Sequence, residues 1–125
     1  MRDLPSNLWN DQHGTTAVEF AIVGPVFIFF VIGLLYVCMA LYAVGSLHYA
    51  VEEGARCASV RTAVCTDASA TLTYTRNHYF GPNSSPIFTF AALACGNSVS
   101  GSANYAMDLG LARFTIPITA TACFP

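Results

Sequence analysis

Residues 15–47 read TTAVEFAIVGPVFIFFVIGLLYVCMALYAVGSL, and the 28 residues from Phe20 to Leu47 contain no Asp, Glu, Lys, Arg or His. As an α-helix this uncharged segment reaches roughly 42 Å, against a membrane hydrocarbon core of about 30 Å. Secretory signal peptides have apolar regions of only about 7–15 residues, so we expect this segment to remain on the protein as a single-pass membrane helix. A buried helix of a soluble protein is the alternative, but 125 residues are too few to enclose it.

The composition of the chain agrees with a membrane protein and excludes other classes. The chain is 54% hydrophobic and 10% charged, its net charge is −2 and it has no Lys. No basic cluster is present to neutralise phosphates, so nucleic acid is not an expected partner. His78 could be combined with Asp67 or Asp108 and a serine into a catalytic triad, but no nucleophile-elbow pattern supports one. The His and Cys residues lack metal-ligand spacing. We therefore expect no enzymatic activity and no cofactor.

The order of the segments predicts an α+β fold. Residues 1–14 form a short polar leader, residues 15–64 a membrane helix that continues as a stalk, and residues 65–125 a small exported domain. Pro25 is expected to distort the helix locally. In the exported domain, residues 66–80 predict a short helix. The runs 87–95, 98–109 and 114–122 predict a three-stranded antiparallel sheet, with turns at Gly96-Asn97 and Gly110.

Four of the five cysteines follow the apolar segment, which suits an oxidising compartment and places the C-terminal part outside the cytoplasm. Cys57, Cys65, Cys95 and Cys123 permit three pairings. A domain this small needs covalent cross-links. We favour Cys57–Cys65, which would close the end of the long helix onto the next segment, and Cys95–Cys123, which would join two strand ends on the same side of the sheet. Cys38 lies inside the apolar segment and is expected to be unpaired.

The stretch after the apolar segment carries a row of small residues and a set of charges on one helix. Ala50, Gly54 and Ala58 lie on one helix face, where small side chains permit close helix packing. We favour a helix-packing surface there, with core contacts inside one protomer as the alternative. Glu52 and Arg56 stand four residues apart, in the favourable order for an ion pair.

The junction before the helix carries the most specific motif. Gly14 is followed by Thr-Thr-Ala-Val and then by Glu19-Phe20 and the long apolar helix. This pattern resembles the processing signal of the type IV pilin superfamily. The run 14–25, the Glu-Gly-Ala-Arg stretch at 53–56 and the ending at 116–125 are similar to TadE-type minor pilins of tight-adherence (Tad, Flp-type) systems. The four residues before Gly14 contain no Lys or Arg, whereas pilin leaders commonly carry a basic residue there.

The resemblance implies a function and a set of partners. A prepilin peptidase is expected to cut between Gly14 and Thr15, with Glu19 and Phe20 serving processing and assembly. The chain would then be a minor pilin or pseudopilin in the bacterial inner membrane. It would act with other pilin subunits and the assembly machinery in pilus biogenesis or surface adhesion, and be extracellular once in the pilus. The alternative is an exported scaffold or sensor domain held by a fixed single-pass anchor.

Overall fold

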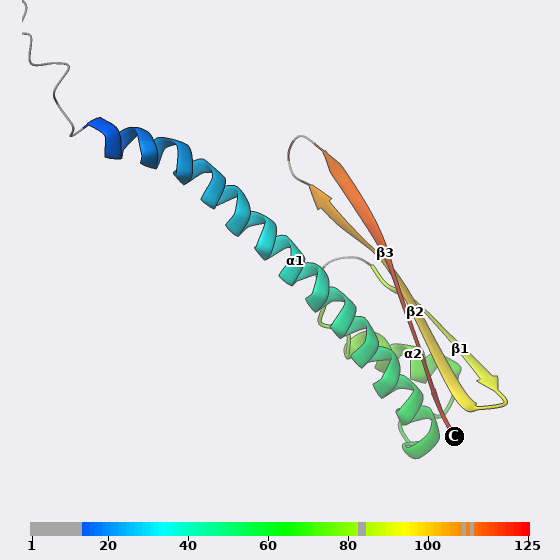
Figure 1. Cartoon of the computed structure of the whole chain (residues 1–125). Coiled ribbons are helices and arrows are strands. Elements are labelled where there is room, and N and C mark those ends of the chain that lie inside the picture. The colour runs from blue at the N-terminus through cyan, green and yellow to red at the C-terminus, as the bar shows by residue number, and fades with distance from the viewer. Residues whose placement is uncertain (1–13, 83–84, 109, 111) are drawn as a thin grey trace, which may run out of the picture. The chain divides into compact units, whose positions relative to one another are not determined.

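The computed structural model describes residues 14–82, 85–108, 110 and 112–125. Its elements in chain order are α1 (Thr15–Val60), α2 (Ala68–Asn77), β1 (Ile87–Leu93), β2 (Gly96–Asp108) and β3 (Arg113–Phe124) (Figure 1). The predicted fold, a long apolar helix followed by a short helix and a three-stranded antiparallel sheet with two disulfides, is confirmed. The expected leader lies outside the described residues except for Gly14.

The chain divides into two compact units, with the boundary between Leu35 and Tyr36 inside α1. In the first unit, none of the described residues is buried. Among the described residues, α1 is the one helix whose length and composition would allow it to cross a membrane. Residues 15–35 reach roughly 31 Å as a helix, which matches a hydrocarbon core of about 30 Å. This apolar helix indicates single-pass membrane anchoring.

The second unit, residues 36–125, is built on one stripe of α1. Ala43, Leu47, Ala50 and Val51 recur at helical spacing and are 0–1% exposed. The stripe packs against the antiparallel sheet, whose strand order is β1-β2-β3 (Figure 1). The buried residues that the sheet contributes are Phe88, Val99, Ala103, Tyr105, Ile118 and Ala120.

Strand β2 is the centre of the sheet because it pairs with β1 on one side and β3 on the other. Its side chains alternate in burial: Val99, Ala103 and Tyr105 face the core, whereas Ser102 and Asn104 are exposed. Gly101 pairs with Phe88 on β1. A Cβ at Gly101 would lie 2.8 Å from the Phe88 ring and 3.0 Å from the Leu47 side chain. A glycine at this position therefore lets the sheet approach α1 closely.

The first hairpin turn differs from the expectation. Leu93 pairs with Gly96, so the loop is Ala94-Cys95, and Gly96-Asn97 begins β2 instead of forming the turn. Gly96 has φ +121°, a conformation that an L side chain rarely adopts. The sequence thus identified the glycine that the turn requires but placed the turn two residues late. In the second hairpin Gly110 does lie in the turn, with φ +77°.

The stalk helix ends at Val60, before the predicted Val64. The reason is the Cys57–Cys65 disulfide, which joins Cα atoms 5.8 Å apart. In a continuous helix two residues eight positions apart are separated by about 12 Å, beyond the reach of a disulfide. The chain must therefore leave the helix between these two cysteines. The second disulfide joins Cys95 and Cys123, so the two pairs are those favoured from the sequence.

Helix α2 begins at a cap and ends where the chain returns to α1. The Asp67 carboxylate accepts a hydrogen bond from the Ala70 N–H at 2.7 Å, as expected of an N-cap residue. The helix ends at Asn77, short of the predicted Phe80. The Phe80 N–H instead donates to the Ser46 hydroxyl on α1 at 2.8 Å. This tertiary hydrogen bond takes the donor that a longer α2 would have used.

We predict that Gly54→Ala destabilises the second unit. A Cβ at Gly54 would overlap the Thr75 hydroxyl and lie 3.2 Å from the Thr75 Cβ. Thr75 is fully buried and donates to the Thr71 carbonyl, so it has little freedom to move. We expect a loss of about 1–3 kcal/mol in the free energy of unfolding, measured by circular dichroism in detergent micelles.

The matched control is Gly45→Ala, in the same helix, where a Cβ would meet nothing within 4 Å. This variant should gain about 0.5–1 kcal/mol from helix propensity. Equal effects of the two alanines would contradict the packing of α2 on α1.

The two disulfides should differ in their contribution to stability. The sequence separation is 28 residues for Cys95–Cys123 and 8 for Cys57–Cys65. The chain-entropy relation for loop closure gives roughly 3.6 and 2.5 kcal/mol, respectively. Denaturant unfolding of the two paired Cys→Ser variants should therefore show the larger loss for the 95–123 pair. The reverse order would mean that the Cys57–Cys65 link holds α2 in place beyond its effect on the unfolded chain.

Candidate functional site

The junction of Gly14 and Thr15 marks the start of α1. Gly14 is exposed and forms a short 3₁₀ turn, and the helix begins at the next residue. A Cβ at Gly14 would meet nothing within 4 Å, and among the described glycines only Gly96 and Gly110 have positive φ. Neither packing nor backbone conformation requires glycine at position 14. The peptide bond that follows is also accessible.

Glu19 lies one helical turn after Thr15 on α1. It is exposed, and its neighbours Val18 and Phe20 are 60% and 79% exposed. Across the part of the chain that the structure describes, the ion pair within 4.0 Å is Asp108–Arg113, so Glu19 has no ion-pair partner there. The structure thus presents a carboxylate and an aromatic ring outward at the start of an apolar helix. An unpaired carboxylate in that position is costly if it enters hydrocarbon.

Helix α1 is unbroken through Pro25. An apolar depression of about 530 Å³ surrounds Gly24 and Pro25, and Phe20 and Phe27 are among the side chains that line it. The depression arises because Gly24 has no side chain and the proline ring is short. It belongs entirely to the first unit.

The row of small residues on α1 lies inside the second unit. Ala50 is fully buried in the core, Gly54 is buried against Thr75 of α2, and Ala58 is half-buried. Ala50 and Gly54 thus make the intramolecular contacts that were the alternative reading of this row. Gly54 does allow close packing of two helices, but the second helix is α2 of the same chain.

The charged residues after the apolar segment do not form the expected ion pair. Within the described part of the chain, neither Glu52 nor Glu53 has a salt bridge to Arg56. These three side chains line an open depression of about 380 Å³ beside the end of β3. Arg61 donates instead to the Tyr74 hydroxyl at 3.0 Å. Glu52, Glu53 and Arg56 are therefore surface charges in contact with solvent.

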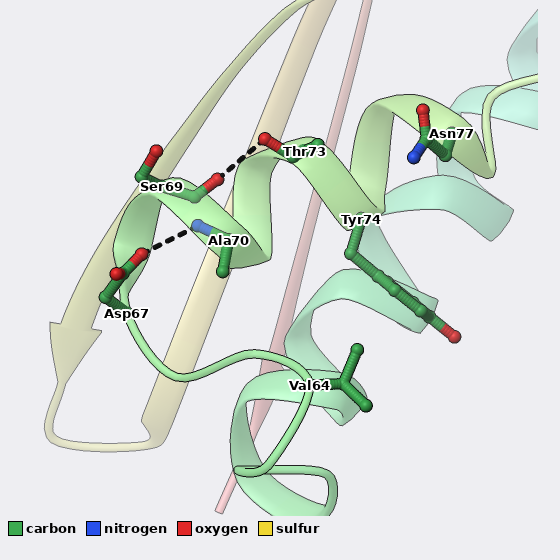
Figure 2. A pocket seen from close by; sticks show the side chains of 7 residues that line it. All are labelled: Val64, Asp67, Ser69, Ala70, Thr73, Tyr74 and Asn77. Atoms are coloured by element: carbon green, nitrogen blue, oxygen red, sulfur yellow. Dashed lines mark hydrogen bonds between the residues drawn. The ribbon is translucent and has the colours of Figure 1, made fainter.

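Another depression, of about 450 Å³, lies beside α2 (Figure 2). The Asp67 carboxylate faces into the turn and binds the Ala70 N–H, while the Thr73 hydroxyl donates to the Ser69 carbonyl at 3.0 Å. These two polar groups therefore serve the helix itself.

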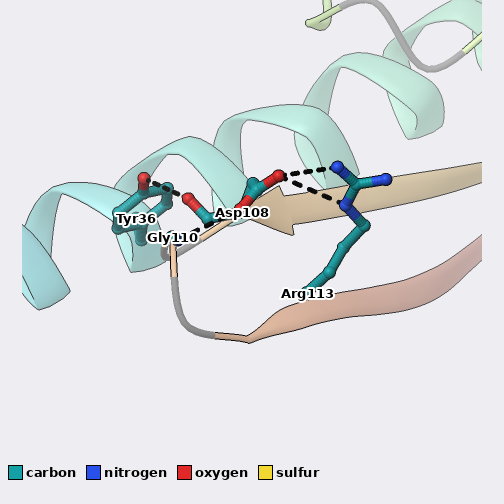
Figure 3. Close-up of polar contacts among 4 residues, drawn as sticks. All are labelled: Tyr36, Asp108, Gly110 and Arg113. Carbon is teal, nitrogen blue, oxygen red and sulfur yellow. Dashed lines mark hydrogen bonds and ion pairs between the residues drawn. The ribbon is translucent and has the colours of Figure 1, made fainter.

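The end of the β2–β3 hairpin is held to α1 by polar contacts (Figure 3). The Tyr36 hydroxyl donates to the Asp108 carbonyl at 3.0 Å, and Arg113 donates to the Asp108 carboxylate at 2.8 Å. The Arg113 guanidinium, and after it the Gly110 N–H, lower the pKa of Asp108 below its usual range. The pair therefore stabilises the folded protein at pH values above the ordinary pKa of the carboxyl. This stabilisation is lost as the pH falls through the lowered pKa. Both side chains are exposed, so solvent screens the attraction.

The aromatic residues of the small domain only partly form its core. Phe88 is buried, and Tyr79 and Phe90 pack against the core cluster from its edge. Phe80 is 62% exposed. Tyr74 is half-buried and stacks on His78 with 4.1 Å between ring centroids. No group of three or more His, Cys, Asp or Glu in the described part of the chain is placed to hold a metal ion.

The comparisons with known proteins bear on the N-terminal half of the chain. The family model described as TadE-like protein matches residues 14–56, about a third of the chain, from Gly14 through Arg56. No curated protein and no solved structure gives a significant match. Over residues 14–56 the chain is therefore similar to TadE-like proteins, as the sequence resemblance predicted.

Proposed function

We propose that this chain is a minor pilin or pseudopilin of a Tad (Flp-type) pilus, cut by a prepilin peptidase between Gly14 and Thr15. The observation that carries the proposal is a coincidence of boundaries. The family match begins at Gly14, α1 begins at Thr15, and Glu19 follows one turn later. Cleavage would thus release the leader and leave a mature protein that starts with its membrane helix.

Glycine at position 14 supports recognition by a partner. A Cβ there would meet nothing within 4 Å in the part of the chain that the structure describes, so the described fold does not select glycine. A peptidase that binds the extended chain around the cut bond would select a residue without a side chain, because the backbone must approach catalytic groups closely. The exposed position of the Gly14–Thr15 bond is compatible with such an enzyme.

Glu19 supports a role in assembly. Cleavage creates an α-amine on Thr15 with an ordinary pKa of roughly 8, so the amine is largely charged at neutral pH. Thr15 and Glu19 stand four residues apart, so their side chains are neighbours on one helix face. An amine on the same or a neighbouring subunit can neutralise the carboxylate at low dielectric. Pairing between subunits then favours insertion beside another pilin over isolation in lipid.

The disulfides support the proposed topology. Both lie after the apolar helix, at Cys57–Cys65 and Cys95–Cys123, and such bonds persist in oxidising compartments. The proposed arrangement is a single pass of the inner membrane with residues 36–125 outside the cytoplasm. Its partners are the prepilin peptidase, the other pilin subunits and the assembly machinery.

A fixed membrane anchor carrying an exported scaffold or sensor is the second candidate. A fixed anchor is compatible with the same helix and disulfides, but it gives no function to the Gly14–Thr15 junction or to Glu19. Processing and incorporation into pili separate the two functions.

One prediction of the proposed function concerns the mature N-terminus. Mass spectrometry of the protein purified from cells with an active prepilin peptidase should find Thr15 as the first residue. Gly14→Val should retain Met1, because the new side chain obstructs the peptidase while leaving the helix unchanged. An intact N-terminus in the unaltered protein would favour the fixed anchor.

A second prediction concerns Glu19. Glu19→Leu should insert into the membrane at normal levels but be lost from purified pili, since it has no charge to pair with the α-amine. Glu52→Leu removes another exposed carboxylate of the same helix, outside the first unit, and should be incorporated normally. Immunoblots of membrane and sheared pilus fractions make the comparison. Normal amounts of the Glu19 variant in pili would refute the assembly role.

A further inference from the structure

The first unit ends at Leu35, and the second unit begins at Tyr36. Residues 15–35 form about 31 Å of helix, enough for the hydrocarbon of one bilayer. Tyr36 is the next residue, and tyrosine is enriched at the level of the lipid headgroups. Its hydroxyl donates to the Asp108 carbonyl at the end of β2 (Figure 3). The end of the β2–β3 hairpin therefore lies at the height of Tyr36, where the membrane interface is expected.

The hairpin end is apolar on the face that turns toward α1. Phe114 and Ile116 continue the alternation that buries Ile118 and Ala120, but they are 52% and 40% exposed. The sheet's inner face is thus covered by α1 in the middle of β3 and uncovered toward the hairpin end. On the other face of β3, Thr119 and Thr121 are exposed and polar.

The uncovered strip and α1 together form a groove of about 260 Å³. Val37 and Leu41 line it from the helix, and Met107 and Ile116 line it from the hairpin. Almost all of the lining surface is carbon. Val37 and Leu41 themselves are 55% and 66% exposed, so the groove is open to its surroundings. In water such a groove would expose a contiguous apolar surface next to the membrane helix.

We propose that this groove binds lipid of the adjoining leaflet, so that the hairpin end is immersed in the headgroup region. The upper part of an acyl chain would lie between α1 and β3, against Leu41 and Ile116. Arg113, which is 75% exposed at the same end, would stand among the headgroups, where long basic side chains are favoured.

Lipid is the occupant that the location favours. The groove begins at Val37, two residues after the first unit ends, and no charged residue occurs in the sequence between Phe20 and Leu47. The proposal does not depend on pilin function, because a fixed anchor would place the same hairpin at the same height. Failure of the peptidase or assembly predictions would leave it standing.

Tryptophan quenching in vesicles tests the proposal. Trp9 is the single tryptophan of the chain, so Trp9→Phe supplies a silent background for the full-length protein. Phe114→Trp reports the hairpin end. Leu93→Trp is the matched control, because Leu93 is similarly exposed, at 57%, but pairs with Gly96 at the opposite end of the sheet. Phe27→Trp, in the first unit, reports insertion.

In phosphatidylcholine vesicles brominated near the top of the acyl chains, the Phe114→Trp emission should be blue-shifted and strongly quenched. The Leu93→Trp emission should be unchanged by bromine, and Phe27→Trp should be quenched. If Phe27→Trp is quenched and Phe114→Trp behaves like Leu93→Trp, the proposal is wrong. The proposal is also wrong if the blue shift of the Phe114→Trp emission depends on the density of protein in the vesicle membrane and bromination causes no quenching. A second copy of the chain would then fill the groove.

A measurement on the unaltered chain guards against a folding defect in the tryptophan variants. A lipid with a photoactivatable diazirine on its acyl chain should label peptides containing residues 37–44 or 114–118, in addition to the membrane helix. Labelling confined to residues 15–35 would overturn the proposal.

Discussion

Helix α1 has to satisfy two different surroundings along one continuous helix. Up to Leu35 all of its described residues are unburied, which is stable only where lipid replaces water. From Ala43 onward one stripe is fully buried by the protein's own sheet. The remaining features follow from this change of surroundings within one continuous helix. These features include the small residues where α1 meets the core, the Cys57–Cys65 disulfide at the end of α1 and the sheet that covers the buried stripe.

The small domain reaches stability through close approach and covalent links instead of a large core. Gly54 allows α2 to touch α1, and Gly101 allows the sheet to touch Leu47. The two disulfides close the regions where the chain reverses direction. By contrast, Gly14 and Glu19 are exposed within the described part of the chain. The fold does not explain these two residues, and the proposed peptidase and subunit contacts would give them a role.

Much of this architecture could be predicted because it rests on local signals. Charge exclusion over 28 residues predicts the helix, Asp67 caps α2, and the alternation in β2 identifies which side chains face the core. The boundaries were less accurate. The expected helix end at Val64 and the expected turn at Gly96-Asn97 were both displaced, because a disulfide and a strand register decided them. The apolar groove was missed, since no local pattern tells that the cover of the sheet ends before Phe114.

The sequence alone determined the apolar helix, its likeness to TadE-like proteins over residues 14–56 and the elements of the small domain, because hydropathy, periodicity and a short motif act over a few neighbouring residues. Only the tertiary structure decided where the membrane helix becomes a core helix. It also decided that Ala50 and Gly54 face inward, and that the hairpin end lies beside Tyr36. Those outcomes depend on which surfaces meet across more than 60 residues of chain, as in the hydrogen bond from Tyr36 to Asp108, and on the space left between them.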